Sequence, residues 1–242
     1  MSVLRRIALF DLDHTLLPID SDYHWADYLA RTGRVGDPVE AQRRNDELME
    51  KYSAGKLTAQ ESAEFMLGLL AGNDPVDLAL WHEDYMREVI RPAILPQAIE
   101  VVRSHLRAGD LCAVVTATNQ FVTAPIARAF GVPYLLATNA EFKTGRYTGK
   151  IDGIACFREG KVTRVQHWLK SLGTSLEQFE TSYFYSDSLN DIPLLEAVTH
   201  PVATNPAPGL RTHAQANGWK ILDLFPQEQA DAMAATATQA NQ

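Results

Sequence analysis

The sequence has few cysteines and no cluster of basic residues. Its 242 residues include only 2 cysteines, which lie far apart in unrelated contexts and form no CxxC pair. A disulfide framework is therefore not expected, and this usage is typical of a reducing cytosol. The formal net charge is -8, and no run of lysine or arginine is present. This balance argues against nucleic acid and against an anionic membrane as partners.

Long apolar runs are also missing. No segment approaches the roughly 18 consecutive apolar residues of a membrane-spanning helix. The opening stretch MSVLRRIALF is too short in apolar residues for a signal peptide, and no small-residue cleavage site follows it. We therefore expect a cytoplasmic protein with no membrane partner. No internal repeat is found, and a hydrophobic content of 46% allows one large core with room for a smaller insert.

The sequence does contain apolar runs that alternate with helical patterns. IALF at residues 7–10 predicts a buried strand, and the segments LCAVVTATN and SYFYSDS predict further strands separated by helix-forming stretches. Between YLLATNAEF and KIDGIACF, the residues TGRYTG predict a hairpin turn. The alternation predicts an α/β fold with a doubly wound, mostly parallel sheet.

One long segment breaks this alternation directly after the first strand. It holds four helical patterns and no strand pattern, and one of them begins with the capping box Thr58-x-x-Glu61. Another, SDYHWADYLARTG, predicts a helix with Ser21 or Asp22 as its N-cap. The predicted division is an all-helical cap at 17–92, a discontinuous α/β core at 1–16 and 93–226, and a C-terminal tail at 227–242.

Three predicted strands end in small polar or acidic residues. Because the carboxyl ends of parallel strands gather at one edge of a sheet, these side chains should lie together. They are Asp11, Asp13, Thr116, Thr118, Asn119, Asp187, Asn190 and Asp191. Four carboxylates in one cleft would repel each other, which indicates a bound cation, and oxygen ligands favour Mg²⁺. The Thr116 hydroxyl and the turn amides before Phe121 could hold a phosphate.

The residues that carry this chemistry are similar to a known family. FDLDHTL, VVTATN, Lys161 in EGKVTR, and SDSLND resemble, in this order, the four motifs of the haloacid dehalogenase (HAD) superfamily. The helical insert stands where that superfamily has its C1-type cap, and the similarity is greatest to the phosphoserine-phosphatase-like subfamily IB. The resemblance implies a Rossmann-like core and a Mg²⁺-dependent phosphatase of a small phosphomonoester, phosphoserine-like or histidinol-phosphate-like, that acts through an aspartyl-phosphate.

The resemblance also implies a role for each matching residue. Asp11 would be the nucleophile, Asp13 the acid and base, Thr116 the hydroxyl that holds the phosphate, and Lys161 the cation that offsets its charge. The metal would bind Asp11, Asp187 and the backbone carbonyl of Asp13, with Asn190 and Asp191 just outside these ligands. Ala117 and Asn119 would neighbour the substrate, and Asp20 lies at the spacing where these enzymes carry an acid for a substrate amine.

The sequence departs from the family at two places and leaves alternatives open. His14 follows the second aspartate where glycine is common, and Ala117-Thr118-Asn119 replaces the glycines usual in phosphoserine phosphatases. Phosphotransfer to another hydroxyl, as in a mutase, and a retired HAD fold that only binds ligands are the alternative functions. Dehalogenation is disfavoured because it needs neither Asp13 nor a metal. The substrate and the oligomeric state are not determined by the sequence.

Overall fold

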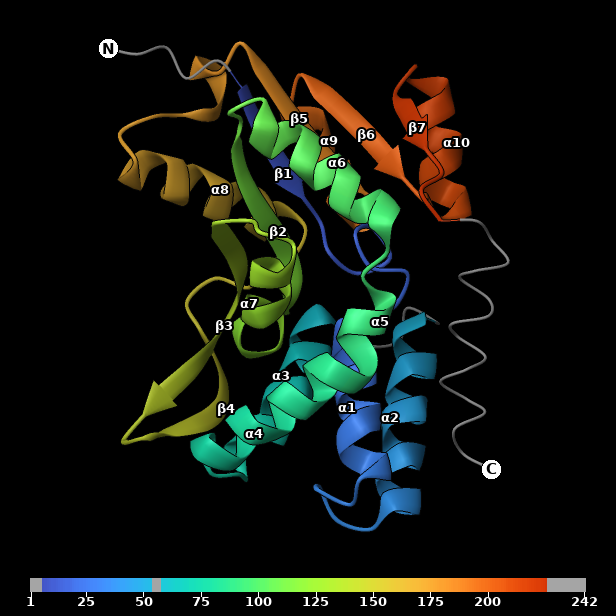
Figure 1. Ribbon diagram of the computed structural model, residues 1–242, viewed down its shortest axis with the longest axis vertical. Coiled ribbons are helices and arrows are strands. Elements are labelled where there is room, and N and C mark those ends of the chain that lie inside the picture. The colour runs from blue at the N-terminus through green and yellow to red at the C-terminus, as the bar shows by residue number, and fades with distance from the viewer. Residues whose placement is uncertain (1–5, 54–57, 226–242) are drawn as a thin grey trace.

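The computed structural model describes residues 6–53 and 58–225, and its centre is a seven-stranded sheet (Figure 1). The order is β4-β3-β2-β1-β5-β6-β7, and neighbouring strands are parallel except β3 and β4. The strands are β1 (Arg6–Phe10), β2 (Leu111–Asn119), β3 (Tyr134–Lys143), β4 (Arg146–Asp152), β5 (Thr181–Ser186), β6 (His200–Thr204) and β7 (Lys220–Leu222). The predicted doubly wound, mostly parallel α/β sheet is confirmed.

The central strand β1 is buried on both faces. The α-helices are α1 (Ser21–Arg31), α2 (Pro38–Ser53), α3 (Ala59–Ala71), α4 (Pro75–Tyr85), α5 (Arg91–Ala93), α6 (Pro96–Arg107), α7 (Gln120–Ala129), α8 (Glu159–Ser171), α9 (Ile192–Ala197) and α10 (Pro208–Ala216). Ala8 and Phe10 pack in one hydrophobic cluster with residues of α6 and α7, whereas Ile7 and Leu9 pack in a second cluster with residues of α8, α9 and α10. This two-sided burial explains the continuous apolar run of the strand.

Helices α1 to α4 follow β1 in the chain and gather beyond the carboxyl ends of the central strands (Figure 1). We call the segment 17–92 the cap segment. The predicted capping box of Thr58 and Glu61 is present at the start of α3. The predicted N-cap of α1 was wrong: the cap is Asp20, whose Oδ1 accepts the Tyr23 N–H at 2.8 Å. Asp22 consequently belongs to the first turn of α1 and is free for other contacts.

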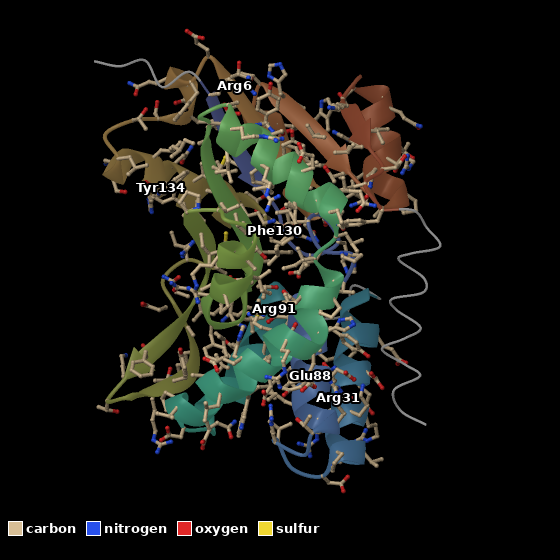
Figure 2. All side chains as sticks on the ribbon, in the orientation of Figure 1. Arg6, Arg31, Glu88, Arg91, Phe130 and Tyr134 are labelled. Atoms are coloured by element: carbon tan, nitrogen blue, oxygen red, sulfur yellow. The ribbon has the colours of Figure 1, made fainter. Side chains whose placement is uncertain are left out.

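The last helix of the cap segment continues toward α6 through a π-helical stretch at Met86–Ile90 and the short α5. Figure 2 shows Arg31 of α1 beside Glu88 of this stretch, and their Nη2 and Oε2 atoms are 3.8 Å apart. Arg34 adds a second link, because its Nη2 lies 3.2 Å from Asp84 Oδ2. These charged pairs join α1 and the turn after it to the end of α4 and the π-helical stretch.

The antiparallel hairpin of β3 and β4 packs against α3, so the sheet also contacts the cap segment. Gly149 of β4 has a φ of +82°, and a Cβ atom at this position would lie 3.3 Å from the Cβ of Ala71. Glycine therefore permits both the left-handed backbone and the close approach of strand and helix.

Two predictions concerned membrane-spanning helices and the C-terminal tail. Within residues 6–53 and 58–225, no helix has both the length and the apolar composition needed to cross a bilayer. The predicted C-terminal tail at 227–242 lies outside the described residues.

Candidate active site

Lys161 lies between two carboxylates at the carboxyl edge of the sheet. Its Nζ is 2.8 Å from Asp11 Oδ1 and 2.7 Å from Asp191 Oδ2, and the lysine is only 3% exposed. Burial alone would lower the pKa of Lys161, but Asp11 and Asp191 raise it well above its usual value. Asp191 also accepts the Ser186 hydroxyl at 2.7 Å. A fixed ammonium group is thus held against the residue that follows β1.

A hydroxyl connects the ends of β1 and β5. Thr15 Oγ1 lies 3.3 Å from Asp11 Oδ2 and 3.1 Å from Asp187 Oδ1, and it accepts the Asp187 N–H at 3.1 Å. One hydroxyl proton cannot serve both carboxylates at once. Burial, followed by the charge of Asp11, raises the pKa of Asp187 to about 7. The two carboxylates therefore share an environment that a cation would stabilise.

The Asp13 carboxylate is held from both the cap segment and the core. The backbone N–H of Ser21 donates to Asp13 Oδ1 at 2.7 Å, and the Thr118 hydroxyl donates to Asp13 Oδ2 at 2.8 Å. Burial, followed by the charge of Asp20, raises the pKa of Asp13 to about 7. A carboxyl group with this pKa can give or take a proton near neutral pH.

The end of β2 supplies hydroxyl and amide groups. Thr116 is buried, and its Oγ1 accepts the Thr118 N–H at 3.2 Å. Asn119 caps α7, because its Oδ1 accepts the Val122 N–H at 3.2 Å. Its Nδ2 donates to Oδ1 of Asp22 in the cap segment at 3.0 Å. The pairing of β2 with β3 shifts register between Val115 and Asn119, where the strand reaches the site.

His14 adopts the backbone conformation that explains why glycine is common there. Its φ is +57°, in the left-handed region that residues with a Cβ rarely adopt. Asn205, which has a φ of +45°, donates from Nδ2 to the backbone carbonyls of His14 at 3.0 Å and Thr15 at 3.3 Å. Its Oδ1 accepts the N–H groups of Leu224 and Phe225 at 2.6 and 3.0 Å. Asn205 thus fastens the loop after β1 to the segment after β7.

A cavity of about 340 Å³ opens among these groups. The predicted site residues that line it are Asp11, Asp13, Asp20, Thr116, Ala117, Lys161, Asp187, Asn190 and Asp191. Asn119 does not line the cavity, but its side chain donates to Asp22, which does line it. The side chain of Asn190 accepts a hydrogen bond from Arg158 Nε at 3.1 Å.

Sequence reasoning missed two of the groups that matter here. Thr15 stood inside the FDLDHTL motif, and only its contact with both Asp11 and Asp187 reveals what its hydroxyl does. Asp22 was interpreted, as an alternative to Ser21, as the N-cap of the first cap helix, because serine and aspartate are both preferred at that position. Its spacing from Asp20 was the available signal, since residues two apart at a helix start cannot both be the N-cap.

The oxygen atoms at the strand ends fit a hard divalent cation. The expected ligands are two carboxylates, Asp11 and Asp187, and one backbone carbonyl, that of Asp13. Among the described residues, no three side chains of the His, Cys, Asp or Glu type form a metal-binding group. The expected set of two carboxylates and one backbone carbonyl consists of oxygen atoms only, and oxygen ligands match Mg²⁺ better than a softer metal.

The sheet and the cavity at its carboxyl edge are those of an α/β enzyme. A family model described as haloacid dehalogenase-like hydrolase matches residues 8–196. The chain belongs to this family, and the predicted assignment as a phosphatase of the family is confirmed.

The chain is similar to a curated relative and to two solved structures. A histidinol-phosphatase from Neisseria meningitidis serogroup C (strain 8013) is 39% identical over 222 residues, which cover 91% of this chain and 100% of that protein. A crystal structure of a protein of unknown function from Bordetella pertussis Tohama I is 68% identical, with a TM-score of 0.90 over 91% of this chain and 99% of that one. A substrate-bound phosphoserine phosphatase complex has a TM-score of 0.64 at 20% identity, covering 90% and 92%, and shares the fold.

Proposed function

We propose that the chain hydrolyses a small phosphomonoester metabolite through an aspartyl-phosphate formed on Asp11. The observation that carries the proposal is the buried Lys161, paired with Asp11 at 2.8 Å and with Asp191 at 2.7 Å beside the cavity. A phosphate that approaches the Asp11 carboxylate is repelled by it, because both groups are negatively charged. The fixed ammonium group offsets this repulsion at the place where the new bond would form.

In the first half of the reaction, a carboxylate oxygen of Asp11 attacks phosphorus. The bond between that oxygen and phosphorus forms, and the bond between phosphorus and the ester oxygen breaks. Asp13, protonated in part because its pKa is about 7, gives its proton to the departing alkoxide.

In the second half, the same Asp13 acts in reverse. Its carboxylate takes a proton from a water molecule, and the water oxygen attacks the phosphorus of the aspartyl-phosphate. The bond to Asp11 breaks, inorganic phosphate leaves, and the Asp11 carboxylate is restored. The hydrogen bonds from Ser21 and Thr118 keep the Asp13 carboxyl group fixed through both halves.

The phosphate oxygens need donors, and the end of β2 offers them. In the proposal, the Thr116 hydroxyl and Lys161 bind the phosphate, with Ala117 and Asn119 at the loop that leads into α7. The amino end of a helix is favourable for an anion because its first N–H groups are unpaired.

Mg²⁺ is the proposed cofactor. Asp11, Asp187 and the Asp13 carbonyl would hold it, and Asn190 and Asp191 would stand just outside these ligands. When bound, the ion offsets negative charge on the phosphate oxygens.

The proposed substrates are phosphoserine-like or histidinol-phosphate-like. The 39% identity to a protein named histidinol-phosphatase supports the second class. Asp20 lines the cavity, which supports the prediction that it binds a substrate amine, although its Oδ1 also caps α1. A cytoplasmic location belongs to the same proposal, since the substrates are metabolites.

A panel of phosphomonoesters that includes histidinol phosphate and phosphoserine tests the proposal. With Mg²⁺ present, we expect inorganic phosphate to be released from at least one panel member. Acid quenching with a substrate labelled at phosphorus should leave label on the protein, and Asp11→Asn should abolish it. No phosphate release from any ester, or label retained in Asp11→Asn, would refute the proposed function.

A further inference from the structure

A backbone turn beside the cavity holds an arginine in a conformation that suits glycine. Arg158 has φ and ψ angles of 51° and -122°, and the N–H of Gly160 donates to the carbonyl of Phe157 at 2.9 Å. These angles match the first central position of a type II′ turn, where glycine is strongly preferred. The Cβ atom of any other residue makes this backbone strained. The turn leads directly into α8, which carries Lys161.

The side chain of this strained residue contacts two residues of the cavity lining. Arg158 Nε donates to Asn190 Oδ1 at 3.1 Å, and its Cζ lies 5.1 Å from the centre of the Phe157 ring. Asn190 and Phe157 both line the cavity, whereas Arg158 itself does not. The guanidinium group therefore reaches the cavity through its neighbours.

The guanidinium donor determines which way the Asn190 amide faces. Guanidinium nitrogens only donate, so the amide must present its oxygen to Arg158 and its Nδ2 group to the other side. The backbone N–H of Asn190 donates to the Ser188 hydroxyl at 3.2 Å, which fixes the start of the short 3₁₀ helix Leu189–Asp191. Within residues 6–53 and 58–225, no acceptor from the protein is found for Nδ2. The amide thus keeps its N–H donors available at the cavity lining.

A second contact joins the same two segments of the chain. Lys161, in the first turn of α8, pairs with Asp191, which directly follows Asn190. The segments are therefore held by a buried ion pair and by the contact of Arg158 with Asn190. Since the ion pair already joins the segments, the contribution left to Arg158 is the orientation of the Asn190 side chain.

We propose that Arg158 is a positioning residue, which directs the N–H groups of Asn190 toward a phosphate bound in the cavity. The proposal rests on the proposed function and adds a residue outside the cavity to it. A phosphate in this cavity gains from every donor that is held in place, because it also meets the carboxylates of Asp11, Asp13, Asp187 and Asp191. The gain offsets the strain of the turn.

Two substitutions separate the backbone from the side chain. Arg158→Gly and Arg158→Ala both remove the guanidinium group, but only glycine relieves the strain. The glycine variant should melt about 2–4 °C above the alanine variant, as measured by calorimetry. Both should bind inorganic phosphate about fivefold more weakly than the wild type, as measured by isothermal titration with Mg²⁺. A merely structural role would couple these effects, so that the more stable variant would bind phosphate better. Equal melting temperatures would overturn the assignment of strain to this turn.

The kinetics should show the same loss for every ester that is hydrolysed. Because the phosphate is common to all of them, KM should rise about fivefold for each, while kcat stays within about twofold. Thr144 provides the control, since it has a φ of +49° in the exposed turn between β3 and β4 and does not line the cavity. Thr144→Gly should melt above Thr144→Ala, and both should keep the wild-type KM.

A double-mutant cycle tests the route through Asn190. In the Asn190→Ala background, Arg158→Ala should cause no further loss of phosphate affinity. A further loss of full size would overturn this route, and unchanged affinity in both Arg158 variants would overturn the inference outright. Hydrolysis of p-nitrophenyl phosphate in these cases would leave the proposed function standing, whereas failure of the whole ester panel would refute the proposed function itself.

Discussion

The two ends of the active-site cavity are built in different ways. At the core end, Asp11 follows β1, Asp187 follows β5 and Lys161 lies in α8. Lys161 donates to Asp11, and the Thr15 hydroxyl lies between Asp11 and Asp187. At the cap end, the carboxylates of Asp20 and Asp22 come from the start of α1, and the Asn119 amide donates to Asp22 from the core. Under the proposed function, the core would fix the chemistry of the phosphate, and the cap segment would determine which alcohol is accepted.

The strongest test of the core end removes the nucleophile. Asp11→Asn keeps the size of the side chain but replaces the attacking oxygen by a weakly nucleophilic amide. We expect phosphatase turnover to fall on the order of 10⁴-fold with the fold intact. Phosphate release and circular dichroism measure the two effects, with Asp152→Asn at the exposed end of β4 as the control. Near-normal turnover in a folded variant would remove Asp11 from the mechanism.

Chelation tests the oxygen ligands at the same end. Excess EDTA should lower turnover by about 100-fold or more, and Mg²⁺ should restore it. Ca²⁺ should restore it poorly, because it prefers more ligands and longer bonds than Mg²⁺. Turnover that persists at full rate in EDTA would contradict the proposed metal site.

Lys161→Met tests the ion pairs that distinguish the core end. The methionine fills the same space but leaves the carboxylates of Asp11 and Asp191 without their cation. Turnover should fall about 100-fold, because the removal of one fixed donor that stabilises transition-state charge typically has an effect of that size. The free energy of unfolding should fall by about 3 kcal/mol, because breaking a buried ion pair leaves an uncompensated charge. Denaturant titration measures this, and Lys170→Met, at the exposed end of α8, serves as control. Equal stability of the two variants would show that these ion pairs contribute little.

Asp20→Ala gives the smallest expected effect and sharpens the distinction within the cap end. Loss of the N-cap should lower the free energy of unfolding by about 1 kcal/mol, similar to Thr58→Ala at the start of α3. If Asp20 instead binds a substrate amine, as the family resemblance implies, KM for 3-aminopropyl phosphate should rise by about tenfold. Thermal melting and steady-state kinetics on the same preparations decide between these two roles.

The core end could be predicted from the sequence because its rules are local. Each strand is an apolar run, and the polar residues that follow it must reach the carboxyl edge in a parallel sheet. Asp11, Thr116 and Asp187 were placed in this way, and they line the cavity. The motifs add Lys161, whose position in sequence alone does not reveal its two ion pairs.

The cap end could not be predicted in the same way. Three acidic or hydroxyl residues in a row, Asp20, Ser21 and Asp22, all suit a helix start, and helix propensity does not decide which one caps. The choice depends on backbone geometry and on partners from distant segments. Asn119, 97 residues away from Asp22, is such a partner.

The sequence by itself determined the class of fold, the strand ends that line the cavity, and the place of the helical segment after β1, because apolar periodicity and residue order suffice for these. Only the tertiary structure decided which carboxylates share a hydroxyl, as Asp11 and Asp187 share Thr15, and which one the core turns toward the cavity, as Asn119 does for Asp22. The physical reason is that hydrogen bonds and charge repulsion act over a few ångströms in space. Separation along the chain does not set those distances; the packing of the cap segment on the sheet does.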